Sequence, residues 1–102
     1  MKSAVGLLEV YGFVTALAAV DAACKAANVT VEAFERNKPA YAEKLKVPLV
    51  IMVKLRGSVS DVAAAIDAGT KSAESIGGVV ASHIIAGPEA ETEKMLSIND
   101  IK

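Results

Sequence analysis

The chain has 102 residues, of which 53% are hydrophobic, 23% charged and only 4% aromatic. This length fits one domain with one core, and the apolar content together with a net charge of −1 excludes a disordered chain. Eleven basic residues against twelve acidic ones leave no electrostatic footprint for nucleic acid. One cysteine cannot form an internal disulfide, and no stretch reaches the roughly 20 apolar residues of a spanning helix. We therefore expect an intracellular domain without nucleic-acid or membrane partners.

The first third of the chain predicts a strand followed by a helix. Apolar alternation predicts a strand over residues 4–10, and a Tyr-Gly pair ends it. Residues 13–27 are rich in Ala and Leu and contain neither Gly nor Pro, so we expect a helix there. Apart from Thr15, Asp21 and Lys25 this helix is apolar all round, which is typical of burial on more than one side.

Two more strands are expected before the second helix. Asn28 is expected to end the first helix in the left-handed conformation, which Asn tolerates. Alternation predicts a second strand over residues 29–34, and the polar residues 35–46 are expected to form a long loop. A third strand is predicted over residues 49–56, with apolar side chains on both faces at its start.

The second half repeats the helix and the strand. Ser58 to Asp61 match a capping box, so a second helix is expected to begin there, run to Ile76 and stop at two glycines. A fourth strand over residues 79–86 and a short acidic helix over residues 89–96 follow. Four residues form the expected buried stripe of the second helix: Val62, Ile66, Gly69 and Ala73.

This order of elements predicts an α+β, ferredoxin-like fold. Such a fold has a four-stranded antiparallel sheet, two main helices on one face and, here, a short C-terminal helix. Apolar side chains remain on the other, uncovered face: Val5, Leu7, Val50 and Met52. Because exposed apolar patches mark interaction surfaces, the pattern predicts oligomerisation.

The sequence offers no constellation for catalysis, a metal or a cofactor. His83 is the only histidine and is expected to have a structural role in the fourth strand. Cys24 is expected to be a small buried residue of the first helix, and together the two give no metal-ligand spacing. Glu89, Glu91 and Glu93 are expected on a solvated helix face. We therefore predict that the chain is not an enzyme and uses no cofactor.

Two stretches carry a resemblance to a known family. The first is the strand of residues 5–12 with the following Ala-Ala-Val-Asp-Ala-Ala-Cys-Lys-Ala-Ala-Asn-Val helix. The second runs from Arg56-Gly57 through Asp67-Ala68-Gly69 to Ser82-His83-Ile84-Ile85 and Pro88. In this order and at these separations they resemble the bacterial microcompartment shell domain of the single-domain, hexamer-forming (BMC-H) type. The resemblance covers residues 3–96, and residues 97–102 form a short polar tail.

The resemblance implies a structural function. Six copies would form a cyclic hexamer tile, and tiles would pack edge to edge into the shell of a bacterial microcompartment in the cytoplasm. A pore on the six-fold axis would pass small metabolites. The implied partners are further copies of the chain, other microcompartment shell proteins and the encapsulated enzymes.

In the family the turn between the second and third strands rims the pore. Four residues here are expected nearest the axis: Asn37, Lys38, Pro39 and Tyr41. The family's turn is short and Gly-rich, whereas this chain has no glycine between Gly12 and Gly57. Three alternatives stay open: a basic ring that favours small anions, a loop that closes the axis, and a loop that gives no fixed width.

The resemblance also places residues at the edge between tiles. Lys25 lies in the family's Lys-Ala-Ala motif and is expected at this edge with Asp21, the alternative being an ordinary surface ion pair between the two. The family usually has an Arg after the fourth strand, where this chain has Gly87 followed by Pro88. We therefore expect sheets of tiles that are weaker or differently arranged than is usual.

A ferredoxin-like oligomeric module that binds a regulatory small molecule is the alternative function. A small acyl-phosphate hydrolase would need a Gly-rich anion loop with an Arg, which the sequence lacks. The mass in solution separates the two remaining interpretations, because a regulator would be a dimer or trimer and a shell tile a hexamer.

Overall fold

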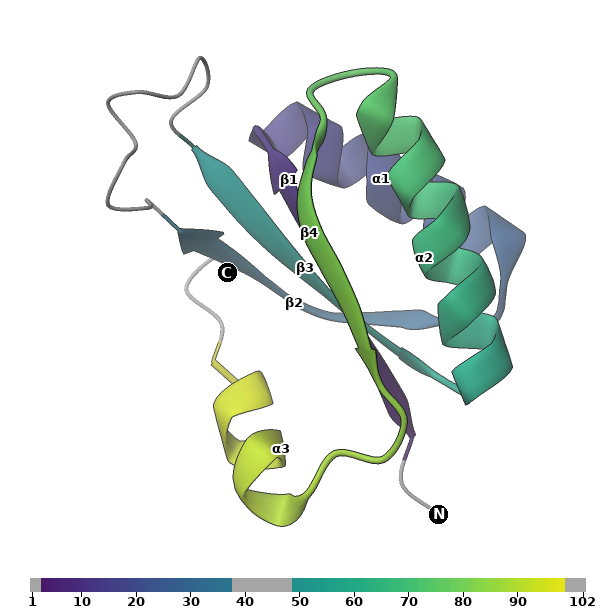
Figure 1. Cartoon of the computed structure of the whole chain (residues 1–102), viewed down its shortest axis with the longest axis vertical. Helices are drawn as coiled ribbons and strands as arrows, with labels where there is room; N and C mark the ends of the chain where they lie inside the picture. The colour runs from purple at the N-terminus through teal and green to yellow at the C-terminus, as the bar shows by residue number, and fades with distance from the viewer. Residues whose placement is uncertain (1–2, 38–48, 99–102) are drawn as a thin grey trace.

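The computed structural model describes residues 3–37 and 49–98, with Asn37 described by its backbone only. These residues form seven elements in order: β1 (Ala4–Tyr11), α1 (Phe13–Ala26), β2 (Thr30–Asn37), β3 (Val50–Gly57), α2 (Val59–Glu74), β4 (Val79–Ile85) and α3 (Ala90–Leu96). In Figure 1, α1 and α2 lie together beside the sheet, and α3 lies well away from both of them. The predicted α+β, ferredoxin-like fold is confirmed.

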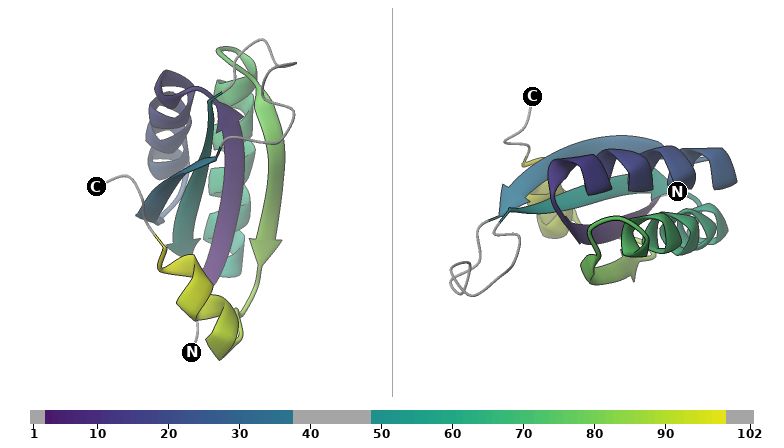
Figure 2. Two further views of the ribbon diagram at one scale, coloured as in Figure 1. Left: turned by 90° about the vertical axis from the view of Figure 1, so that its left-hand side faces the viewer. Right: turned by 90° about the horizontal axis from the view of Figure 1, so that it is seen from above.

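The four strands form one antiparallel sheet in the order β2-β3-β1-β4. The central pair is β1 and β3, in which Leu8 lies opposite Val53. Because side chains alternate along a strand, the residues in register with Leu8 face the helices and their neighbours face away. The strands twist across the helices, as Figure 2 shows.

The four apolar residues predicted on the second face do share that face, although two of them are not exposed. Val5 and Val50 are 0% and 2% exposed, whereas Leu7 and Met52 are partly exposed. The exposed apolar part of this face is therefore smaller than the pattern alone predicted.

Small side chains bring the two helices close to each other and to the sheet. Ala16, Ala19 and Ala23 of α1 are fully buried. A Cβ atom placed on Gly69 of α2 would lie 3.2 Å from the Ala19 carbonyl oxygen and 3.2 Å from a methyl group of Leu8. Glycine at this position thus allows the backbones of α1 and α2 to approach over β1. The predicted stripe of α2 is buried as expected.

Within one copy α1 is buried on one side only, whereas its all-round apolar sequence predicts burial on more than one side. The helix buries one stripe only, and Phe13, Val14 and Leu17 are exposed. Cys24 is exposed as well, so its predicted burial is wrong. The physical reason is geometric, because Cys24 is turned about 100° around the helix from the buried Ala23.

The end of α1 and the length of β2 also differ. Ala27 caps α1 with an extended φ of −154°. None of the described non-glycine residues has a positive φ, so the prediction that Asn28 ends the helix in the left-handed conformation is wrong. The predicted loop was to begin at Glu35, but β2 continues to Asn37 because this stretch pairs with β3. The other strand and helix ends agree with the prediction within two residues.

The predicted cap of α2 is confirmed, because Ser58 and Asp61 are joined by hydrogen bonds at the start of the helix. The Ser58 hydroxyl accepts a hydrogen bond from the Asp61 backbone N–H at 3.1 Å. The Asp61 carboxylate accepts from the Ser58 hydroxyl at 2.9 Å and from the Asn28 backbone N–H at 3.4 Å. The cap therefore connects the start of α2 to the chain just beyond α1.

We predict that Gly77→Ala strongly destabilises the fold. A methyl group at this position would lie inside van der Waals contact with the Tyr11 carbonyl oxygen and the Thr15 side chain. Overpacking against backbone costs about 1–3 kcal/mol, which lowers the midpoint of thermal unfolding by about 4–8 °C per kcal/mol. Gly87→Ala is the matched control, since nothing lies within 4 Å of its added methyl group. Equal unfolding midpoints for the two variants would contradict the packing described here.

Candidate functional site

One end of the sheet joins the start of α1 to the end of β2. Tyr11 of β1 and Asn37 of β2 both pair with Val50 of β3, so the three backbones lie side by side. The Gly12 N–H donates a hydrogen bond to the Leu49 carbonyl at 2.9 Å, which holds the turn into α1 against the start of β3. Of the predicted pore residues, Asn37 lies here, and three lie outside the described residues: Lys38, Pro39 and Tyr41.

An apolar margin extends from this end along α1 and β2. The rings of Phe13 and Phe34 meet edge to face, with centroids 5.8 Å apart and an interplanar angle of 77°. Next to them Val14 is 72% exposed, and Leu17 and Val31 are exposed too. We call these five residues the α1–β2 margin. Exposed apolar side chains gathered on neighbouring elements make this margin a candidate contact surface.

The opposite edge of the sheet is β4, and it has a different character. Its sequence is Val-Val-Ala-Ser-His-Ile-Ile, without a charged residue or a proline. Proteins usually protect an edge strand with charges, prolines or bulges, because its outer backbone groups are free to pair with another chain. Of these three devices β4 has only a register shift near its start, where Glu9 pairs with Ala81 and Val10 with Val79. His83 is exposed on this strand and, with Glu9 and Met52, lines a cavity of about 110 Å³. The β4 edge is therefore a second candidate contact surface.

Two charged residues of the predicted loop 35–46 belong to β2 and not to a loop. Glu35 and Arg36 belong to β2, and the Glu35 carboxylate pairs with the Lys54 ammonium at 3.0 Å. The stretch 38–48 contains three lysines and one glutamate. The surplus of two positive charges per copy is thus the same without Glu35 and Arg36.

The predicted edge residues Lys25 and Asp21 form an ion pair in one copy. The Lys25 ammonium lies 2.7 Å from the Asp21 carboxylate, and the Lys25 side chain is 75% exposed. The hydrogen bond and charge of Asp21 raise the pKa of Lys25 above its ordinary value. Lys25 therefore stays charged at neutral pH, and the stability that its raised pKa contributes is lost as alkaline pH removes that proton.

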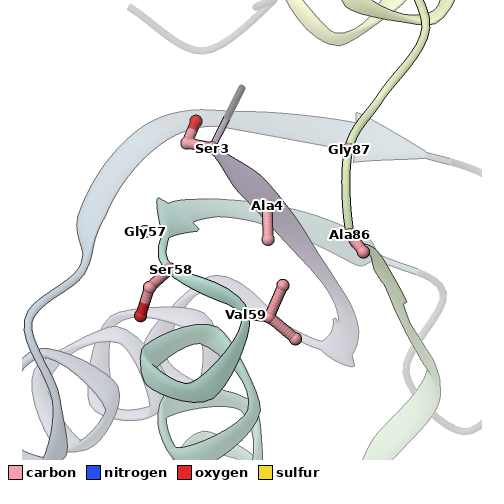
Figure 3. A pocket seen from close by; sticks show the side chains of 7 residues that line it. All are labelled: Ser3, Ala4, Gly57, Ser58, Val59, Ala86 and Gly87. Atoms are coloured by element: carbon pink, nitrogen blue, oxygen red, sulfur yellow. The ribbon is translucent and has the colours of Figure 1, made fainter. Parts of the chain in front are cut away.

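Gly87 and Pro88 lie at the end of the sheet where β1 begins. Gly87 lines a cavity of about 530 Å³, and Pro88 is fully buried within the chain. Figure 3 shows that this cavity is surrounded by small side chains from the starts of β1 and α2 and from the segment after β4. The Asn28 carbonyl lies close to Gly57, another lining residue, so the C-terminal end of α1 is near the same end of the sheet.

A group of charged residues that sequence reasoning missed lies on the face turned away from α1 and α2. Arg56 of β3 pairs with Glu32 of β2 at 3.2 Å and with Glu93 of α3. Lys54 of β3 is almost fully buried and pairs with Glu35. Two basic residues two positions apart in an otherwise apolar strand were the sequence signal, since alternation puts both on one face.

The described residues offer no site for a metal ion. No group of three or more His, Cys, Asp or Glu side chains that could hold one occurs among residues 3–37 and 49–98. Over the same ranges, every buried side-chain nitrogen and oxygen has a hydrogen-bond partner. No helix in the described part of the chain is long and apolar enough to cross a membrane.

Comparison with known proteins identifies close relatives. The chain is 37% identical to the bacterial microcompartment shell protein PduA of Citrobacter freundii over 95 residues, covering 93% of this chain and 92% of the relative. It is 37% identical to the carboxysome shell protein CcmK2 of Synechococcus elongatus over 100 residues, covering 96% and 89%. It is 38% identical to the carboxysome shell protein CsoS1A of Hydrogenovibrio crunogenus, covering 93% and 91%.

A solved structure and a family match agree with these relatives. The crystal structure of a microcompartment protein from Desulfitobacterium hafniense superposes with a TM-score of 0.69 at 24% identity, which supports the fold. The match covers all of this chain and 51% of that one, so the chain spans about half the length of that protein. The BMC domain family matches residues 4–88. The chain therefore belongs to the bacterial microcompartment (BMC) domain family.

Proposed function

We propose that the chain is a structural shell protein of a bacterial microcompartment in the cytoplasm, and that it works as a cyclic hexamer tile. Its shell domain is proposed to span residues 3–96. The observation that carries the proposal is the match of residues 4–88 to the BMC domain together with relatives named as shell proteins over nearly their whole length. The proposed partners are further copies, other shell proteins and encapsulated enzymes.

Two different surfaces at opposite edges of the sheet support a ring. The α1–β2 margin is apolar and aromatic, whereas the β4 edge is an uncharged strand with free backbone groups on its outer side. A contact that joins different patches on neighbouring copies is heterologous, and it forms a closed ring when the rotation between copies fits. Two identical patches would instead favour a dimer.

We predict that light scattering of the purified protein gives a mass of about six times 10.5 kDa. Val14→Glu should dissociate the ring, because it buries a charge in the apolar contact of each copy. Met95→Glu is the control, since Met95 is similarly exposed but lies on α3, outside the α1–β2 margin and outside β4. A stable monomer or dimer of the wild type would overturn the hexamer and favour the regulatory module.

Contacts between tiles are proposed to involve Lys25. Its aliphatic part would pack at the edge while the ammonium donates to backbone carbonyls of the next tile. In one copy the ammonium has Asp21 as its partner, and both side chains are largely exposed. This exposure leaves Lys25 able to exchange its partner when tiles meet. Gly87 offers no side chain at the same edge, which supports weaker sheets than an Arg would give.

Electron microscopy of Lys25→Ala and Lys71→Ala tests this contact. The control is closely matched, since Lys71 is also 75% exposed and pairs with an Asp four residues earlier, Asp67, at 3.1 Å. We expect Lys25→Ala to form hexamers with an unchanged unfolding midpoint but to lose or reorder the sheets. Lys71→Ala should form sheets like those of the wild type. Identical sheets from both variants would exclude a role of Lys25 in tiling.

The segment after β2 is proposed to line the pore. Asn37 ends β2 at the sheet end that also carries the exposed start of α1, and residues 38–48 add a surplus of two positive charges per copy. Six copies would place these charges around one opening. Rings of basic side chains favour anions in other pores.

We predict that Lys38→Glu lowers the passage of small anions relative to neutral solutes by several-fold, measured across membranes that contain the hexamer. The substitution replaces one positive charge per copy by a negative one beside the opening, a net change of −2, and electrostatic selectivity depends on this local charge. Lys71→Glu makes the same charge change on the outer side of α2 and should leave the ratio unchanged. Equal ratios in all three proteins would exclude an electrostatic pore, and no passage at all would mean that the segment closes the axis.

A further inference from the structure

The C-terminal helix α3 is too short to be stable by itself. It has seven residues, and isolated helices shorter than about 12–15 residues are marginal in water. Its outward side carries the exposed Met95, and its inward side carries the buried Leu96. The contacts that hold α3 on the sheet therefore decide whether the helix exists.

Two basic residues of β3, Lys54 and Arg56, make polar contacts with α3 and the residue pair that follows it. The Arg56 guanidinium pairs with Glu93 of α3. The Lys54 ammonium donates to the carbonyl oxygens of Leu96 at 3.3 Å and Ile98 at 2.7 Å. A cation at this position satisfies carbonyls that a helix end leaves without partners and opposes the negative end of the helix dipole.

The same two cations also bind β2. Arg56 pairs with Glu32 at 3.2 Å, and Lys54 pairs with Glu35 at 3.0 Å. Each cation of β3 is thus shared between the neighbouring strand and α3. We call these five side chains the docking network: Glu32, Glu35, Lys54, Arg56 and Glu93.

Lys54 is the centre of the docking network because its charge is almost completely buried. Its side chain is 4% exposed, whereas its partner Glu35 is 35% exposed. An ammonium has three N–H donors, and among the described residues Lys54 donates to the two carbonyls at the end of α3 and pairs with Glu35. When α3 leaves, the buried cation loses these two carbonyl acceptors. Since an unsatisfied buried charge is costly, Lys54 must then turn toward water or rearrange with Glu35.

We propose that α3 is a releasable latch on the sheet, and that Lys54 couples its docking to the Asn37 end of β2. Docked α3 gives Lys54 two carbonyl acceptors and, through Lys54, holds Glu35 in place, two residues before β2 ends. Release of α3 frees Lys54 and with it the end of β2. The coupling stands on the docking network alone. Its consequence for a pore rests on the proposed function, because the segment after β2 is the proposed pore lining.

Reciprocity provides the sharpest test. If α3 acts on β2 through Lys54, then a change on β2 must act equally on α3. Glu35→Gln is such a change, because Glu35 contacts Lys54 and lies on a different element from α3. Without the carboxylate the buried ammonium loses the one charged partner that the described residues give it and turns toward water, away from the carbonyls of α3.

The measurement is hydrogen exchange of the full-length assembled protein, followed by mass spectrometry. Glu35→Gln should speed exchange in residues 90–98 about three- to tenfold and leave α1 and α2 unchanged. Glu9→Gln is the control, because Glu9 and Glu35 lie opposite Met52 on its two sides and the described residues give Glu9 no ion pair. Exchange in residues 90–98 within twofold of the wild type in Glu35→Gln would overturn the coupling.

A second pair of variants tests the latch itself. Lys54→Met should speed exchange in both α3 and the end of β2, because the methionine fills the space without the three donors. Lys94→Met also removes a lysine, but Lys94 is exposed and pairs with Glu91 inside α3, so only α3 should change slightly. Fast exchange of α3 with unchanged β2 in Lys54→Met would overturn the coupling, and unchanged α3 would overturn the latch.

Discussion

The close approach of α1 and α2 over the central strands is the constraint on which the rest of the structure depends. Gly69 leaves room for the Ala19 carbonyl and for Leu8 beneath it, and a methyl group at Gly69 would press against both. A helix pair packed through alanine and glycine is thin and leaves little space for large rings. The two phenylalanines accordingly lie at the margin of the core, where their rings meet each other.

Large apolar side chains that the interior does not accommodate lie on the outside of the molecule. Val14 and Leu17 project from the side of α1 that faces neither α2 nor the sheet, and β4 presents an uncharged edge. A single copy therefore leaves apolar surface and backbone groups unsatisfied at two separate edges. This pattern is unusual for a monomer but fits a subunit that is enclosed by neighbours on both sides.

The sequence predicted the elements whose signals are local and missed those that depend on distant partners. The cap at Ser58 and the apolar stripe of α2 follow from spacing within one helix, so both were predictable. The last residues of β2 are polar and look like a loop, and they are a strand only because β3 pairs with them. The exposure of Cys24 was missed because composition does not show which side of an apolar helix is covered. For Lys54, alternation gives the face, but its two carbonyl acceptors come from residues about 40 positions later.

The two faces of the sheet are thus stabilised by different forces. The face toward α1 and α2 is held by apolar packing, which depends little on salt. The other face contains the buried Lys54 and the partly buried Arg56, whose charges are compensated by carboxylates and by the carbonyls at the end of α3. Because the carboxylates in this network remain about one third exposed, solvent and ions reach the ionic contacts from one side. The packing of α1 and α2 on the sheet is therefore independent of the ionic contacts that hold α3 on the other face.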